Sequence, residues 1–170
     1  SSSKMTFVIV GIVLVSSFSS NSKFAPGTVG TLWAWAAFLI LRPHLGDVQW
    51  AWLIGIGFVL GCWASAVTAR HLGKADPGCV VWDEVIAFWI VLWLVTPASL
   101  LAQTIAFALF RLFDAAKPGP VGWADRCFKP RSDATGEARI GWRDGLGIML
   151  DDLVAALCTL LVIAAWRFVW

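Results

Sequence analysis

The sequence predicts an all-α fold: a small helical integral membrane protein with several short or broken transmembrane or re-entrant helices. Hydrophobic residues make up 59% of the 170-residue chain, and the mean hydropathy of +0.76 is far above that of soluble globular proteins. Many of the twelve tryptophans lie near the ends of apolar runs, as residues that anchor helices at a membrane surface do. No apolar run alternates like a β-strand, and the length favours a single domain over residues 1–170.

Two short apolar segments are expected at the amino-terminal end. Residues 5–20 are too short for a full membrane span, which favours a partial or re-entrant helix. They also resemble a signal peptide, but we expect them to be retained, because a turn motif begins soon afterwards at Phe24. A second apolar helix is predicted over residues 31–41, between the turn at residues 24–31 and Arg42-Pro43.

Two longer apolar runs occupy the middle of the chain. Residues 48–69 are uncharged and long enough to span a membrane, and Arg70 and His71 follow them. After a loop over residues 73–80, a second uncharged run covers residues 85–110 with Pro97 near its middle. Because the residue before proline avoids the helical conformation, we expect two shorter helices hinged at Pro97.

The carboxyl-terminal third begins with the most polar part of the chain. Residues 117–145 are rich in glycine, proline and charge, and are expected to form an extramembrane loop. The last helix is predicted over residues 146–170. Basic residues near positions 70 and 126 favour a cytoplasmic location for their loops. Nucleic-acid binding is not expected, because these charges interrupt membrane segments and form no basic face.

Acidic residues beside the apolar runs are the main functional signal. A carboxylate at membrane depth costs about 2.5–3.5 kcal/mol to insert. Carboxylate oxygens are also the ligands that a hard cation such as Mg²⁺ prefers. We therefore expect one divided site in which five carboxylates supply both the catalytic and the metal-binding groups. These are Asp83, Glu84, Asp114, Asp151 and Asp152.

The two acidic pairs also have a plain structural explanation. Acidic side chains at the start of a helix cap it and are favoured by its dipole. Neighbouring helix positions point about 100° apart, so Asp83 and Glu84 are not expected to bind one ion in the same way. Capping explains Asp151 and Asp152 less well, because these acids continue into an apolar helix with no basic residue at the following helical spacings.

Two further motifs have the chemistry of a phosphate site. Arg111, Asp114 and Lys117 recur every three residues and would share one helix face, either as phosphate ligands or as a salt-bridge ladder. Residues 25–31, which read APGTVGT, could cradle a phosphate with backbone N–H groups and two hydroxyls, or form only a turn and cap. The expected phosphate-binding residues are Lys23, Gly27, Thr28, Thr31, Arg111 and Lys117.

These motifs together indicate phosphoryl chemistry. A metal-activated water that attacks phosphorus is the simplest mechanism, and a covalent aspartyl-phosphate is the alternative. Neither His44 nor His71 lies beside a nucleophile in the sequence, and no Ser-His-Asp set is evident.

Four motifs in order resemble the phosphatidylglycerophosphatase A family, bacterial Mg²⁺-dependent membrane phosphatases. They are residues 25–31, residues 81–84, residues 110–114 with Lys117-Pro118 and Pro120, and residues 147–155. The sequence departs from the family at Ala87 and Ala156, where glycine is usual. Residues 129–143 also look longer than in typical members.

The resemblance implies hydrolysis of the terminal phosphomonoester of phosphatidylglycerophosphate, which gives phosphatidylglycerol and phosphate in phospholipid synthesis, with Mg²⁺ as cofactor. It implies a multi-pass protein of the bacterial inner (cytoplasmic) membrane, with the active site on the cytoplasmic face and the lipid substrate and bilayer as partners. The oligomeric state stays open.

Two other function classes share some of these sequence features. A small membrane transporter or channel would share intramembrane acids, but the helices are few and no inverted repeat is visible. A CDP-alcohol phosphotransferase would need a D-G-x-x-A-R signature, and Asp144-Gly145 is not followed by that pattern.

Overall fold

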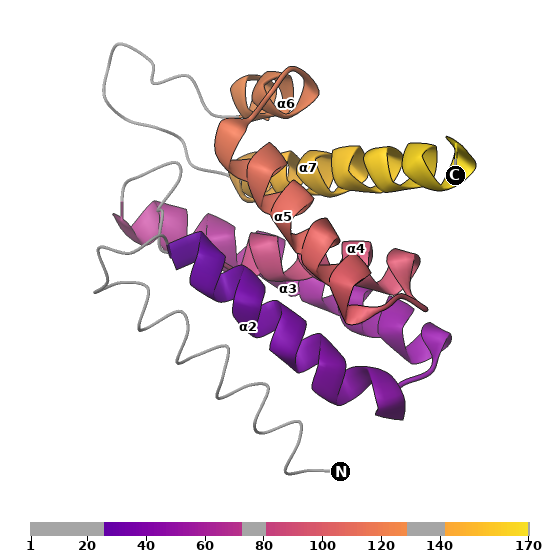
Figure 1. Cartoon of the computed structure of the whole chain (residues 1–170). Helices are drawn as coiled ribbons and strands as arrows, with labels where there is room; N and C mark the ends of the chain where they lie inside the picture. Colours follow the sequence, from indigo (N-terminus) through magenta and orange to yellow (C-terminus); the bar gives the residue numbers. More distant parts are fainter. Residues whose placement is uncertain (1–25, 73–80, 129–141, 170) are drawn as a thin grey trace.

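The computed structural model describes residues 26–72, 81–128 and 142–169, and within them the fold is helical without strands (Figure 1). This confirms the predicted all-α class. The elements are α2 (Pro26–Leu41), the short 3-10 helix η1 (Arg42–His44), α3 (Asp47–Leu72), α4 (Trp82–Val95), α5 (Leu100–Ala116), α6 (Pro120–Phe128) and α7 (Trp142–Val169). The predictions for residues 5–20, for Lys23 and for the loop at residues 73–80 lie outside the described residues.

Helix α2 begins earlier than the sequence suggested. We expected a turn up to Thr31 and a helix from there, but the helix already starts at Pro26. Proline suits the first helical position, because the N–H group it lacks would have no partner inside the helix. Thr31 therefore does not cap the helix, and its hydroxyl donates to the carbonyl of Gly27 at 2.8 Å.

The predicted break at Pro97 is confirmed. Helix α4 ends at Val95 and α5 begins at Leu100, so the uncharged run forms two helices. Ser99 caps the second one, since its hydroxyl accepts the N–H of Ala102 at 3.2 Å.

The prediction that residues 117–145 form only a loop is wrong. Residues 120–128 form α6, and α7 already begins at Trp142. Proline at the first position of α6 again favours a helix start. Val121 and Ala124, three residues apart, are both buried, and α6 packs against α7. The surrounding glycine, proline and charged residues outnumber this short apolar stripe, so the sequence of this region is typical of a loop.

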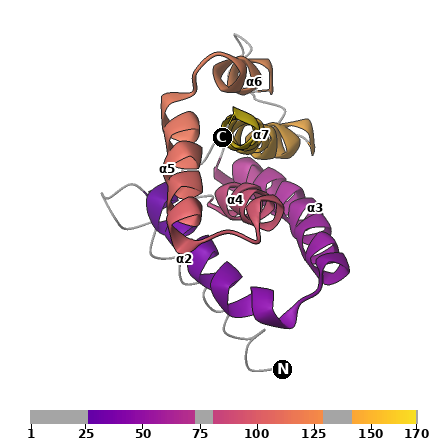
Figure 2. The same cartoon turned by 45° about the vertical axis from the view of Figure 1, so that its right-hand side comes forward.

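Helix α4 is the centre of the fold. Figure 2 shows it surrounded by α2, α3, α5 and α7, and it packs against all four. Most of its side chains are buried, which explains why it is apolar on every side. Ala87 and Ala156, the two positions at which the resemblance leads us to expect glycine, are both buried in this packing.

Two indole hydrogen bonds join α4 to its neighbours. Trp89 Nε1 donates to the carbonyl of Ala34 in α2 at 2.8 Å, and Trp82 Nε1 donates to the carbonyl of Gly57 in α3 at 2.7 Å. A β-carbon at Gly61 would collide with the Trp82 indole, so α3 approaches α4 closely only because this position is glycine.

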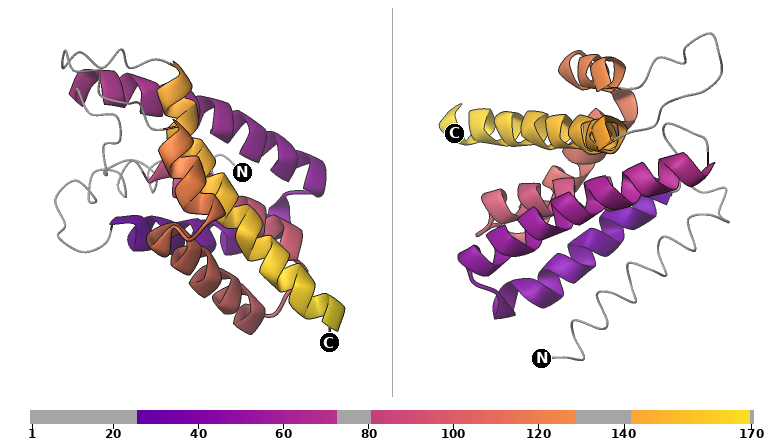
Figure 3. Two further views of the ribbon diagram at one scale, coloured as in Figure 1. Left: turned by 90° about the horizontal axis from the view of Figure 1, so that it is seen from above. Right: turned by 180° about the vertical axis from the view of Figure 1, so that it is seen from behind.

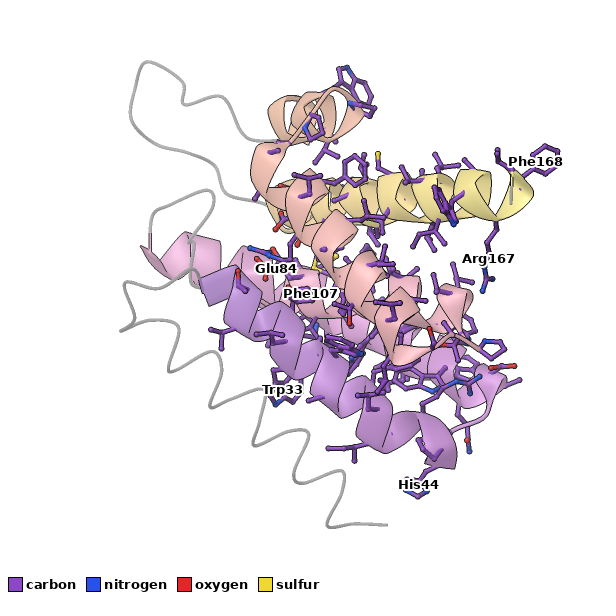
Figure 4. All side chains as sticks on the ribbon, in the orientation of Figure 1. Trp33, His44, Glu84, Phe107, Arg167 and Phe168 are labelled. Atoms are coloured by element: carbon purple, nitrogen blue, oxygen red, sulfur yellow. The ribbon has the colours of Figure 1, made fainter. Side chains whose placement is uncertain are left out.

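Helix α7 crosses α3, as the left view of Figure 3 shows, and packs on it. Of the helices in the described ranges, one meets the length and apolarity needed to cross a membrane, over Met149–Val169. Only 22% of its apolar window is buried inside the protein. The apolar part of α3, Asp47–Trp63, is shorter. Figure 4 shows Glu84 near one end of the helices and His44 and Arg167 near the other.

Candidate functional site

The predicted site residues of α4, α5 and α7 come together at one end of the helices. Asp83 and Glu84 are in the first turn of α4, Asp114 is near the end of α5, and the last pair lies in α7. All four other carboxylates lie close enough to Asp152 for their charges to act on it. The five acids named from the sequence therefore share one region, and Figure 4 shows oxygen and nitrogen atoms gathered around Glu84.

The two acidic pairs have the same local geometry. The N–H of Glu84 donates to Oδ1 of Asp83 at 3.0 Å, and the N–H of Asp152 donates to Oδ1 of Asp151 at 3.1 Å. The first acid of each pair thus turns back to the backbone of the second. The positive end of the α4 dipole also favours its two carboxylates, whereas the N-cap residue itself is Val81, which makes no side-chain cap hydrogen bond. The position of the pair in the first turn therefore fits the dipole, which does not account for the other acids nearby.

Arg111 joins α5 to α4. Its Nη1 lies 2.5 Å from Oδ2 of Asp114 and 3.4 Å from Oε1 of Glu84. The three-residue spacing predicted the first pair. The second contact crosses between helices, and no spacing in the sequence could have revealed it. One guanidinium therefore ties two of the predicted carboxylates together.

The predicted placement of Lys117 on the same helix face is wrong. Helix α5 ends at Ala116, and Lys117 follows with a left-handed backbone (φ 42°). This conformation ends a helix and redirects the chain. The ammonium group consequently lies 2.6 Å from Oδ2 of Asp151 in α7. Lys117 remains in the site, but it is paired with another helix.

The start of α2 packs directly on Glu84. The fully buried Thr31 hydroxyl lies 3.4 Å from Oε2 of Glu84, besides donating to Gly27. A β-carbon at Gly27 would overlap the Glu84 carboxylate, so glycine is required for this approach. The amino-terminal end of α2 has a positive dipole, which favours a carboxylate at this place. Gly27 and Thr31, predicted from the sequence as phosphate ligands, thus contact Glu84, and no spacing in the sequence indicates this contact.

The protonation of Glu84 reflects these surroundings. Burial raises the pKa of Glu84 from 4.5 to about 7, the charge of Arg111 lowers it, and the charge of Asp114 raises it. Because this value lies near neutrality, Glu84 can exchange a proton under ordinary conditions.

The donor set fits a hard cation. Oδ2 of Asp152 is buried and has no hydrogen-bond partner among the residues that the structure describes, and such a carboxylate oxygen is costly unless a cation or donor reaches it. The described residues place two cations, Arg111 and Lys117, among the five carboxylates. Within those same residues, however, no three acidic, histidine or cysteine side chains already surround one point. The fit to Mg²⁺ rests on oxygen chemistry and surplus negative charge.

Comparison with known proteins points to one family. A family model described as phosphatidylglycerophosphatase A matches residues 11–167. The chain is 33% identical over 144 residues to the phosphatidylglycerophosphatase A of Haemophilus influenzae, covering 85% of this chain and 80% of the relative. It is 32% identical over 137 residues to the protein of the same name from Escherichia coli K12, covering 81% and 71%.

A third relative has a different name. A protein of Bacteroides thetaiotaomicron, provisionally named a phosphatidylinositol-3-phosphatase, is 32% identical over 169 residues, covering 95% of this chain and 94% of the relative. No solved structure matches the chain.

Proposed function

The chain belongs to the phosphatidylglycerophosphatase A family, and on this premise we propose that it hydrolyses the terminal phosphomonoester of phosphatidylglycerophosphate to phosphatidylglycerol and phosphate, in a reaction that depends on Mg²⁺. Membership in a family of phosphatases weighs against the transporter and the CDP-alcohol phosphotransferase alternatives.

The observation that carries the proposal is the meeting of five carboxylates with Arg111 and Lys117. Each of these cations is already paired with a carboxylate, so its head group is held at the site before any ligand arrives. Phosphoryl transfer depends mainly on positioning and on neutralising the charge of the phosphate oxygens. The two cations would position and neutralise the phosphate, and the surplus of carboxylates would bind the metal.

The carboxylates would hold one or two Mg²⁺ ions. Asp152, with its unpartnered oxygen, and Asp83, Glu84, Asp114 and Asp151 are the candidate ligands. Bound Mg²⁺ would neutralise phosphate oxygens and lower the pKa of the attacking water.

The protein's own residues would bind and orient the phosphate. Arg111 can turn from Glu84 toward a phosphate, with which a guanidinium makes two parallel hydrogen bonds. Lys117 can do the same from Asp151 as a point charge. Gly27 and Thr31 also contact the Glu84 carboxylate and restrict its position. Backbone N–H groups at the start of α2, including that of Thr28, lie at a helix end that favours anions.

We further propose that the protein is multi-pass in the bacterial inner membrane, with α7 and α3 as crossing helices. The 21 residues of Met149–Val169 would extend about 31 Å at 1.5 Å per residue, close to the roughly 30 Å of the hydrocarbon layer. The acids lie at the start of this stretch, and Trp166 and Arg167 at its end. Basic residues near positions 70 and 126 favour a cytoplasmic location for the acidic end.

Phosphate release from phosphatidylglycerophosphate in detergent micelles tests the proposal, measured with Mg²⁺ and with EDTA. Phosphatidic acid and phosphatidylinositol-3-phosphate serve as parallel substrates. We expect Mg²⁺-dependent release that is fastest with phosphatidylglycerophosphate, and loss of activity in Asp83→Asn and Asp152→Asn. Faster release from phosphatidylinositol-3-phosphate would reassign the substrate, and full activity in both folded variants would refute the carboxylate site.

A further inference from the structure

We propose that an apolar groove between α5 and α7 holds an acyl chain of the lipid substrate. This inference rests on the proposed function and extends it, because it assigns the part of the protein that binds the substrate away from the reacting phosphate.

The groove is a cavity of about 470 Å³, within the size range of small-molecule sites. Its walls come from the end of α4, one side of α5 and the second half of α7. The lining residues are Val95, Ala102, Ile105, Leu109, Val162, Ile163, Trp166 and Arg167. All except Arg167 and the indole of Trp166 offer only hydrocarbon. A polar headgroup would find almost no hydrogen-bond partners there, whereas an acyl chain needs none.

The groove follows the same two helices that carry the site. Val162 and Ile163 come eleven residues after Asp151 and Asp152 in α7. Eleven residues are about three helical turns, so each lies on the same face as its acid, about 16 Å further along. In α5, Leu109 precedes Asp114 by five residues, or about 7.5 Å. Leu109 lies on another face of α5 than Asp114, so in this helix only the rise is short. Along the helix axes, the groove starts about 7.5 Å from Asp114 in α5 and about 16 Å from the acids of α7, and it runs away from them.

Arg167 is at the far end of the groove and does not contradict an apolar occupant. It lies in the last turn of α7, fifteen residues after Asp152. An arginine there can line the groove with its aliphatic stem and extend its guanidinium to the membrane surface. A lipid whose phosphate occupies the acidic site would thus direct its chain into the groove and along α7 in the direction of Arg167. This single orientation matches the polar and apolar parts of the substrate to those of the protein.

Filling the groove with a larger side chain tests the proposal. Val162→Trp would occupy it, and Leu161→Trp is the matched control, because Leu161 is the neighbouring residue of the same helix, is 59% exposed and does not line the groove. Both variants are assayed with phosphatidylglycerophosphate that carries either two sixteen-carbon or two six-carbon chains. We expect Val162→Trp to raise KM for the long-chain substrate about tenfold and to leave KM for the short-chain substrate nearly unchanged, and Leu161→Trp to change neither.

Several outcomes would overturn this assignment. Equal effects of Val162→Trp on both substrates would indicate a general disturbance, and no effect on either would show that the chain binds elsewhere or that a bulk lipid occupies the groove. If Val162→Trp does not fold, Ile105→Trp in α5 replaces it, with the exposed Leu101→Trp as control. If the unchanged protein releases no phosphate from either substrate, the proposed function fails and the groove's role falls with it. Normal hydrolysis without chain-length discrimination in the variants refutes the groove alone.

Discussion

Replacement of Gly27 by alanine should disable the site and leave the fold in place. A β-carbon at this position would lie 2.6 Å from both Cδ and Oε2 of Glu84, and closer still to Oε1. Ordinary contact begins near 3.4 Å, so the carboxylate would have to retreat by at least 0.8 Å, the difference between these two distances. Helix α2 has little freedom to move instead, because Thr31 is fully buried beside the same carboxylate one turn later.

The expected loss follows from this displacement. A shift of about 1 Å in a positioned group can lower a rate about 100-fold. Overpacking costs about 1–3 kcal/mol of stability, and the gain in helix propensity from glycine to alanine offsets about 0.5–1 kcal/mol of it. We therefore expect phosphate release to fall roughly 100-fold and the unfolding midpoint to fall by only a few degrees.

Phosphate release from phosphatidylglycerophosphate and thermal unfolding in detergent measure these two effects. Gly55→Ala is the matched control, because a β-carbon at Gly55 meets nothing within 4 Å. It should keep full activity and an equal or higher midpoint. If Gly27→Ala retained half of the activity or more, the packing of α2 on Glu84 would not matter to the reaction. An equal loss in Gly55→Ala would show a general effect of alanine in these helices.

Three further predictions concern the ionisable groups of the site. Asp152→Asn replaces a buried carboxyl group, one oxygen of which has no hydrogen-bond partner among the described residues, with an amide of the same shape. Its unfolding midpoint in EDTA should therefore change by no more than about 2–4 °C. Mg²⁺ should raise the midpoint of the unchanged protein but not that of this variant, and a retained Mg²⁺ effect would contradict the role of Asp152 as a ligand. Lys117→Met keeps the aliphatic stem but removes the ammonium paired with Asp151. KM for phosphatidylglycerophosphate should therefore rise about 10–100-fold, as expected for a lost charged hydrogen bond. Lys117→Arg should recover part of the loss, and an unchanged KM in Lys117→Met would count against phosphate binding by Lys117. Burial raises the pKa of Glu84 from 4.5 to about 7, so on raising the pH the unfolded chain loses this proton before the folded protein does. The stability of the metal-free protein should therefore fall as the pH rises from 4.5 to about 7. In Glu84→Gln the unfolding midpoint should depend less steeply on pH over that range, and an identical dependence would refute the raised pKa of Glu84.

Local rules predicted the parts of this fold that depend on near neighbours in sequence. Pro97 marked the break between α4 and α5, because proline restricts the residue before it. The three-residue spacing of Arg111 and Asp114 predicted their contact. The acids were identified from their position beside apolar runs, and all five are close together in the structure.

Tertiary contacts explain what the sequence could not reveal. The proline, two glycines and two threonines of residues 25–31 are typical of a turn, yet α2 begins at Pro26 and Gly27 packs against Glu84 in another helix. Lys117 adopts a left-handed backbone that is far commoner for glycine, so nothing in its spacing indicated that it would reach Asp151. Contacts between helices, such as that of Arg111 with Glu84, depend on how α4 and α5 fold back at Pro97.

The pairing of Arg111 and Lys117 with carboxylates has a consequence for turnover. Glu84, Asp114 and Asp151 pair with the two cations that we assign to phosphate and would compete with it for them. An incoming phosphate must displace them, which weakens its binding, and they can reclaim their partners as soon as the ester bond is broken. We expect such a site to hold inorganic phosphate loosely, so that the product leaves without a separate opening of the helices.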